Sequence, residues 1–237
     1  MSFKIQNMKL ALLALIFIAI FTSLGIWQLS RATEKKLLIK SYTQRTQLAP
    51  LTLGSILEPG DWRFYRIELT GEFDNAHTLL LDNKIVDGKV GYEVYTPFHI
   101  AGWNKSILVD RGFVRIGTSR RKLPAIAPIT GKTTIDGMLN LPPTYVKLGQ
   151  LTDTPTHFPM RIEYIRLPEI AEILQQDALF SYVLLLNPTD ARAYPIKWEI
   201  VTMKPEKHMA YAVQWFAFAL TLLILFVALN RPTTSPK

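Results

Sequence analysis

The stretch "KHMAYAVQWFAFALTLLILF", residues 207–226, decides the architecture of this chain. His208 is its second residue, and no charged residue follows that histidine until Arg231. A second uncharged run, "LALLALIFIAIFTSLGIWQL", covers residues 10–29. About 20 consecutive residues of this kind are enough for a helix to cross a bilayer. We therefore predict two transmembrane helices.

The composition agrees with a membrane protein that also has a folded part outside the bilayer. The chain has 237 residues and a formal net charge of +8, but only 19% of its residues are charged. This combination, with a positive mean hydropathy, favours a membrane protein over a nucleic-acid binder. The chain has no cysteine, which excludes disulfides, thiol catalysis and thiolate metal sites.

The first apolar run is predicted to stay in the mature protein. It is too long for the apolar part of a signal peptide, and no clear A-x-A cleavage site follows it. Two spans put both termini on one side of the membrane. Basic residues flank the first run on both sides, so charge leaves the orientation open. The expected segments are an N-terminal tail at 1–9, spans at 10–30 and 208–230, a domain at 31–207 and a C-terminal tail at 231–237.

The segment between the spans has the pattern of a β-rich domain. A helical continuation of the first span is expected to end before Pro50, after which alternating apolar residues indicate strands. A short helix is expected to begin at Pro168. About seven strands with one or two helices predict an α+β fold, either a mostly antiparallel sheet or a small barrel-like domain. Strands are expected at 64–73, on both sides of a turn at Asp87-Gly88, and at 106–116, 133–139, 161–167, 181–186 and 197–203.

The sequence has no recognisable catalytic motif. It has no H-E-x-x-H, no P-loop and no G-x-S-x-G. Asp110 and Arg111 are expected to form a local, structural ion pair at a strand end. The four histidines are His77, His99, His157 and His208. No two of them are separated by a spacing typical of metal ligands.

Polar and aromatic residues gather at the edge of the first span. Trp27, Gln28, Arg31 and Lys35 fall within about a 100° arc of a helix. One interpretation is an aromatic anchor with cations that reach the headgroups. The other is an interfacial groove for a ligand that is apolar at one end and anionic at the other.

The second span offers a similar choice. Pro205 can open the helix, which puts His208 in or near its first turn. A flat apolar macrocycle with carboxylate arms would suit this face, with the imidazole bound to its iron. The alternative is a histidine that only caps or hydrates the helix. Alanines between aromatic residues would leave a shallow slot beside the histidine on a shared helical face: His208, Tyr211, Ala212, Trp215 and Ala219.

Three motifs in this order resemble the signatures of the Surfeit locus protein 1 family. They are "LGIWQLSRATEK", then "GYEVYTPF" followed by "ILVDRGFV", and finally "KHMAYAVQWFAFA". The chain departs from the family at Asp110, where the family often has Asn, and at Phe113, where it often has Trp. Before the histidine, "PEKH" replaces an Asn-rich pattern.

The resemblance implies an assembly factor for haem–copper cytochrome c oxidase that catalyses no reaction itself. Such a factor would bind haem a transiently and assist its insertion into subunit I. Its other partners would be oxidase assembly factors, including haem a synthase, and it would not bind nucleic acid. The location implied is a bacterial inner membrane, with cytoplasmic termini and a periplasmic domain. His208 would ligate the haem iron, and further residues would contact the haem: Tyr211, Trp215, Trp27, Gln28 and Arg31.

Two other functions remain open at this point. One is a cofactor-free membrane scaffold that stabilises oxidase assembly intermediates. The other is a membrane-tethered enzyme, which would need a compact cluster of histidine, carboxylate and serine. Its base would be His77, His99 or His157.

Overall fold

The computed structural model describes most of the chain and divides it into two compact units. The described residues are 8–117, 120, 122–143, 151, 157–176, 179–196 and 198–230. One unit combines Met1–Ser41 with Glu199–Lys237, and the other is Tyr42–Trp198. We call them the helical unit and the barrel unit.

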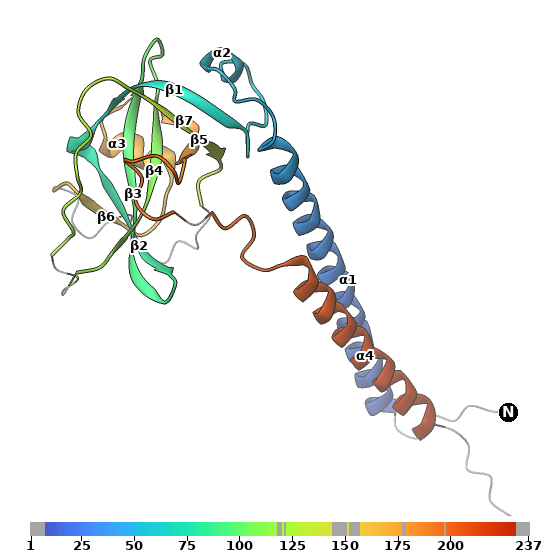
Figure 1. Ribbon diagram of the computed structural model, residues 1–237. Helices are drawn as coiled ribbons and strands as arrows, with labels where there is room; N and C mark the ends of the chain where they lie inside the picture. Colours follow the sequence, from blue (N-terminus) through green and yellow to red (C-terminus); the bar gives the residue numbers. More distant parts are fainter. Residues whose placement is uncertain are drawn as a thin grey trace, which may run out of the picture. The chain divides into compact units, whose positions relative to one another are not determined.

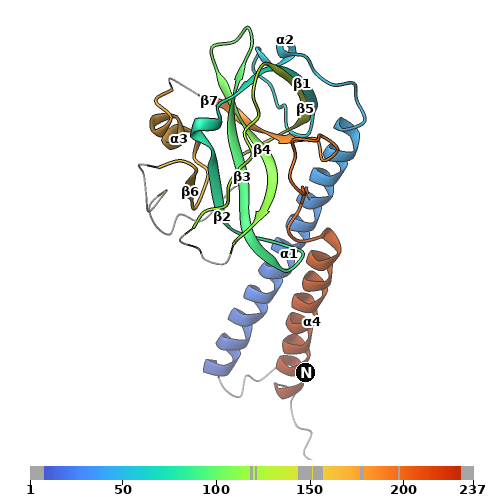
Figure 2. The same cartoon turned by 60° about the vertical axis from the view of Figure 1, so that its left-hand side comes forward.

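Two long helices make up the helical unit. Helix α1 runs over Met8–Arg45 and α4 over Pro205–Leu229, and they lie side by side in Figures 1 and 2. Both are long and apolar enough to cross a membrane, and only 11% of each apolar window is buried. That exposure does not fit a core helix of a soluble domain, so the two helices indicate a membrane protein. Pro205 stands in the first turn of α4, as predicted.

Small residues let the two helices approach each other closely. A Cβ added to Gly25 of α1 would lie 2.6 Å from the ring of Phe216 on α4. Ala32, Ala212 and Ala219 are also buried, which is the pattern of helix pairs in membranes. The alanines of α4 therefore do not line an open slot between aromatic residues, as the sequence suggested. Their small size serves helix packing instead.

The barrel unit is built on a seven-stranded sheet. The strands are β1 Arg66–Phe73, β2 Leu79–Val86, β3 Lys89–Ile100, β4 Ser106–Arg115, β5 Thr133–Asn140, β6 Met160–Ile162 and β7 Leu179–Leu186. Their order is β1-β5-β7-β4-β3-β2-β6, and an additional β1–β3 pairing closes five strands into a barrel (Figure 2). Among the strands that the structure describes, β2–β6 and β4–β7 pair in parallel and the other pairs are antiparallel. The predicted α+β fold, mostly antiparallel and barrel-like, is confirmed.

Alternation along the strands builds the core of the barrel. In β1, buried residues alternate with more exposed ones from Ile67 to Phe73, because successive side chains point to opposite faces of a strand. Phe73 packs edge-to-face on Phe98, with ring centroids 4.8 Å apart. The β2–β3 hairpin turns at Asp87 and Gly88, both with positive φ. This turn was predicted, and such φ values suit the twist of a hairpin.

Short helices lie in the segments before and between the strands. They are α2 Leu53–Ile56, η1 Asn75–His77 and α3 Leu167–Ile173. The helix predicted from Pro168 is α3, and Pro168 stands in its first turn. Helix α2 was not predicted, since a single turn leaves too short a pattern to detect.

The strand predicted at 197–203 is wrong. Residues 198–203 form no strand, and residue 197 lies outside the described residues. Just before them, the Tyr194 N–H donates to Arg111 O at 2.6 Å, and the Phe113 N–H donates to Pro195 O at 2.9 Å. Pro195 has no N–H with which to extend this ladder. The five-stranded barrel is also already closed by β1–β3, which leaves the segment without a barrel edge to join.

Candidate functional site

A histidine of α4 and a glutamine of α1 meet inside the helical unit. His208 Nδ1 lies 2.7 Å from Gln28 Oε1. An amide oxygen only accepts hydrogen bonds, so Nδ1 carries the proton that is donated. In the neutral imidazole, Nε2 is then the nitrogen with a free lone pair. This contact brings together two residues that the sequence analysis proposed for cofactor binding.

The second ring nitrogen of His208 is unpaired within the part of the chain that the structure describes. The residue is only 8% exposed, and Nε2 makes no hydrogen bond with any described residue. A buried acceptor without a donor costs about 1–3 kcal/mol. Histidines that bind metals usually donate their other N–H to an oxygen, which orients the ring and makes the ligating nitrogen more basic. His208 and Gln28 have this arrangement, so the residues present fit a haem iron bound at Nε2.

Aromatic rings lie further into the spans from this pair. Phe21 of α1 stacks on Trp215 of α4, with centroids 5.6 Å apart and planes 28° apart. Phe218 lies 5.8 Å from Phe21 and 5.9 Å from Trp215. These contacts form an apolar wall across both helices. Trp215 was predicted from the sequence, but Phe21 and Phe218 were not. Phe21 follows Phe17 at the four-residue spacing of helix neighbours, which is a sequence signal that could have indicated it.

The other predicted haem contacts are at more open positions. Trp27 is 53% exposed and Tyr211 is 45% exposed, as expected of aromatic anchors at an interface. Arg31 forms an ion pair with Glu34 at 2.5 Å, and Lys35 approaches the same carboxylate at 3.4 Å. Exposed pairs of this kind contribute at most about 1 kcal/mol. Another carboxylate could therefore replace Glu34 at little cost.

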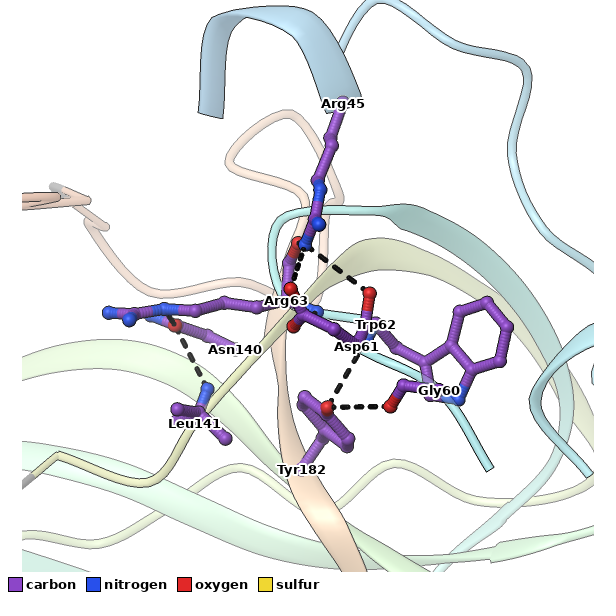
Figure 3. A network of polar contacts seen from close by, with 8 residues as sticks. All are labelled: Arg45, Gly60, Asp61, Trp62, Arg63, Asn140, Leu141 and Tyr182. Atoms are coloured by element: carbon purple, nitrogen blue, oxygen red, sulfur yellow. Dashed lines mark hydrogen bonds and ion pairs between the residues drawn. The ribbon is translucent and has the colours of Figure 1, made fainter. Parts of the chain in front are cut away.

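A polar network in the barrel unit holds the last turn of α1 (Figure 3). Arg45 Nη1 lies 2.7 Å from Asp61 Oδ2 and donates to Arg63 O at 2.9 Å. The guanidinium also lies 5.0 Å from the centre of the Tyr65 ring. A cation at a helix C-terminus interacts favourably with the helix dipole. These contacts hold Arg45, in the last turn of α1, against the segment that leads into β1.

The same network continues to the strands of the barrel (Figure 3). The Tyr182 hydroxyl donates to Gly60 O at 3.1 Å and accepts from the Trp62 N–H at 3.2 Å. Arg63 Nε donates to Asn140 Oδ1 at 3.0 Å. Burial lowers the pKa of Arg63. Because these partners are up to 122 residues apart in the chain, no local sequence pattern indicated the network.

The ion pair predicted between Asp110 and Arg111 is absent. Neighbouring residues on a strand point to opposite faces, so the two side chains of β4 separate. Asp110 Oδ1 accepts from the Gly112 N–H at 2.9 Å. Burial, aided by the nearby Glu93 carboxylate, raises the pKa of Asp110 well above its usual value.

Arg111 is buried on the other side of β4. It is 2% exposed, and Nη2 donates to Ala127 O at 3.0 Å. Its guanidinium lies 5.2 Å from the centre of the Tyr194 ring and 5.8 Å from that of Phe73. Burial lowers the pKa of Arg111. Arg111 therefore contributes to packing between the barrel core and the segment around Ala127.

A histidine, carboxylate and serine cluster joins η1, β3 and β4. Asp74 Oδ2 lies 2.6 Å from His77 Nδ1 and 3.7 Å from His99 Nε2, while His99 Nδ1 lies 2.7 Å from Ser106 Oγ. The 3.7 Å separation is too long for a hydrogen bond, and Ser106 is buried, so its hydroxyl is not presented to a substrate. His157 is exposed. Within the described ranges, no group of three His, Asp or Glu residues could hold a metal ion.

Comparisons with known proteins agree with the three motifs. Residues 15–220 match the model of the SURF1 family. The SURF1-like protein of Rickettsia felis is 26% identical over 235 residues, which cover 96% of this chain and 100% of that protein. Surfeit locus protein 1 of Takifugu rubripes is 27% identical over 213 residues, 81% of this chain and 85% of that protein. The cytochrome oxidase assembly protein SHY1 of Saccharomyces cerevisiae is 28% identical over 94 residues, 38% of this chain and 24% of that protein.

Proposed function

We propose that this chain, which belongs to the SURF1 family, is an assembly factor for cytochrome oxidase that binds haem a and assists its insertion into subunit I. The family match over residues 15–220 supports the assembly role. A similar protein that is named for cytochrome oxidase assembly supports it as well. The chain itself catalyses no reaction in this proposal. Haem a is the cargo, and it supplies redox chemistry only after it reaches the oxidase.

The observation that carries the haem proposal is the state of His208. Its Nδ1 lies within hydrogen-bond distance of Gln28 Oε1, and its buried Nε2 has no hydrogen-bond partner among the described residues. A histidine that only capped or hydrated the helix would place Nε2 in water or on a donor. Haem iron takes an imidazole nitrogen as an axial ligand. Nε2 of His208 is the atom that would bind it.

Three further groups would assist binding. Gln28 is a positioning residue, since it keeps the proton on Nδ1 and turns Nε2 towards the ligand. Trp215, stacked on Phe21, offers an aromatic surface to the macrocycle. Arg31 could exchange Glu34 for a haem propionate, because a guanidinium binds carboxylates in a two-pronged geometry.

The remaining expectations follow from the family and from the two spans. We place the chain in a bacterial inner membrane, with its termini in the cytoplasm and the barrel unit in the periplasm. Its partners would be oxidase subunit I and other assembly factors, including haem a synthase, which makes the cargo. A chaperone of this kind must release haem as well as bind it. One protein ligand at a helix end, with exposed ion pairs around it, suits transient binding.

The test is an absorbance spectrum of detergent-purified full-length protein, produced in cells that make haem a. We expect wild type to carry haem a and His208→Ala to lose it. Gln28→Leu should reduce haem occupancy and shift the Soret band, and Gln28→Glu should restore binding because a carboxylate also accepts from Nδ1. Gln214→Leu is the matched control, since Gln214 is an exposed glutamine of α4.

Two results would count against the proposal. Full haem occupancy with an unchanged spectrum in both His208→Ala and Trp215→Ala would show that the site is wrong. Capture of subunit I by haem-free protein, at the same yield as with haem, would favour the cofactor-free scaffold.

A further inference from the structure

A groove opens between α1 and α4 beyond the aromatic wall. Its volume is about 480 Å³, and it is lined by Phe17, Phe21, Phe218, Thr221 and Leu222. Four of these side chains are large and apolar, and three are aromatic. We propose that this groove holds the long isoprenoid chain of haem a, the substituent that haem b lacks. The inference rests on the function proposed above and adds the part of the site that selects between haems.

The groove lies at a suitable distance from the imidazole. Ten residues of α4 separate His208 from Phe218, which is about 15 Å along the helix, and Leu222 is about 6 Å further. On α1, Gln28 is about 10 Å from Phe21 and about 16 Å from Phe17 by the same rise. Both helices thus place the groove at a similar depth. An isoprenoid chain of farnesyl length spans this interval when extended from a macrocycle bound at His208.

The groove is continuous with the proposed macrocycle surface. Phe21 stacks on Trp215 and also lines the groove. Phe218 contacts both of these rings and lines the groove as well. A ligand on Trp215 that carries an apolar chain would meet groove side chains directly beside its ring. The macrocycle and the isoprenoid chain would therefore bind to adjoining surfaces on the same two helices.

The selection would come from packing against preformed walls. A hydrocarbon chain gains little by moving from lipid into an apolar groove, because both surroundings are apolar. It gains dispersion contacts where aromatic rings already line the space. Lipid acyl chains could also lie in the groove, but they would not distinguish haem a from haem b. The comparison of the two haems therefore tests the proposed occupant.

The experiment titrates the purified full-length protein with haem a and, separately, with haem b, and follows the Soret absorbance. Leu222→Trp fills the groove. We expect it to weaken haem a binding by about tenfold and to leave haem b binding within about twofold. Leu225→Trp adds the same bulk at an exposed position of α4 and should change neither affinity. Retained haem b binding also shows that the Leu222→Trp protein is folded.

The outcomes separate this inference from the proposed function. If Leu222→Trp leaves haem a affinity unchanged, or weakens both haems equally, the groove does not hold the chain although the haem site stands. If wild type binds the two haems with equal affinity and His208→Ala binds neither, the proposed function is supported but the groove does not select between haems. If wild type binds neither haem, both ideas are overturned.

Discussion

The barrel unit is packed with large side chains, whereas the two helices of the helical unit pack through small ones. Large side chains that alternate along strands fill the barrel, as Phe73 and Phe98 show. The helices meet through Gly25 and buried alanines, with a histidine and a glutamine joined between them. Deleting atoms should therefore damage the barrel, whereas adding atoms should damage the helix pair. The candidate site depends on the second kind of packing.

The largest effect is expected from Phe98→Ala in the barrel core. Phe98 is fully buried against Phe73, and truncating a buried phenylalanine costs about 3–5 kcal/mol. Thermal unfolding of the purified protein should show a clearly lower Tm for the barrel. Ile85→Ala, at an exposed strand position, should stay within about 0.5 kcal/mol of wild type. An equal loss in both variants would mean that the core is not where the structure places it.

Gly25→Val should have the next largest effect, and it should act on the helical unit. The added Cβ would meet the Phe216 ring at 2.6 Å, and overpacking of this kind costs about 1–3 kcal/mol. The helices must separate, which strains the contact between His208 and Gln28. We expect weaker haem binding in the Soret titration and an unchanged Tm of the barrel. Ile26→Val is the control, because Ile26 is one position away and exposed. Equal haem affinity of Gly25→Val and Ile26→Val would contradict close helix packing.

Tyr182→Phe tests the polar network of Figure 3. It removes the hydroxyl that bonds Gly60 O and the Trp62 N–H. Loss of these hydrogen bonds should cost about 1–2 kcal/mol of barrel stability. Tyr211→Phe removes the hydroxyl of an exposed residue of α4 and should leave the free energy of unfolding of the barrel nearly unchanged. The prediction fails if chemical denaturation gives the two variants the same stability.

Asp110→Asn should have the smallest effect, and only its pH dependence is diagnostic. Burial raises the pKa of Asp110 in the folded state. In the unfolded chain the same carboxyl has the ordinary aspartate pKa of about 3.9. As pH rises, the unfolded chain therefore loses this proton before the folded chain does. Wild-type stability must then fall with rising pH until the folded group also ionises. Asparagine keeps the oxygen that accepts from the Gly112 N–H and cannot ionise. The stability of the variant relative to wild type should increase with pH across this window. A constant difference between pH 4 and 8 would refute the raised pKa of Asp110.

Local patterns predicted much of this molecule, and their failures have physical causes. Twenty-residue apolar runs and a turn at Asp87-Gly88 need only neighbouring residues, so both predictions were confirmed. The segment 197–203 alternates like a strand but has no barrel edge to join. The pair of Asp110 and Arg111 looked local, yet strand geometry sends the two side chains to opposite faces.

By itself, the sequence determined the two spans, the β-rich class and the residue types at the interface, because these depend on composition and period over short windows. Only the tertiary structure decided which of those residues meet. His208 and Gln28 lie 180 positions apart, and the antiparallel approach permitted by Gly25 brings them within hydrogen-bond distance. That contact leaves Nε2 of His208 as the free ring nitrogen. A contact between distant residues depends on the path of the whole chain, which no local pattern records.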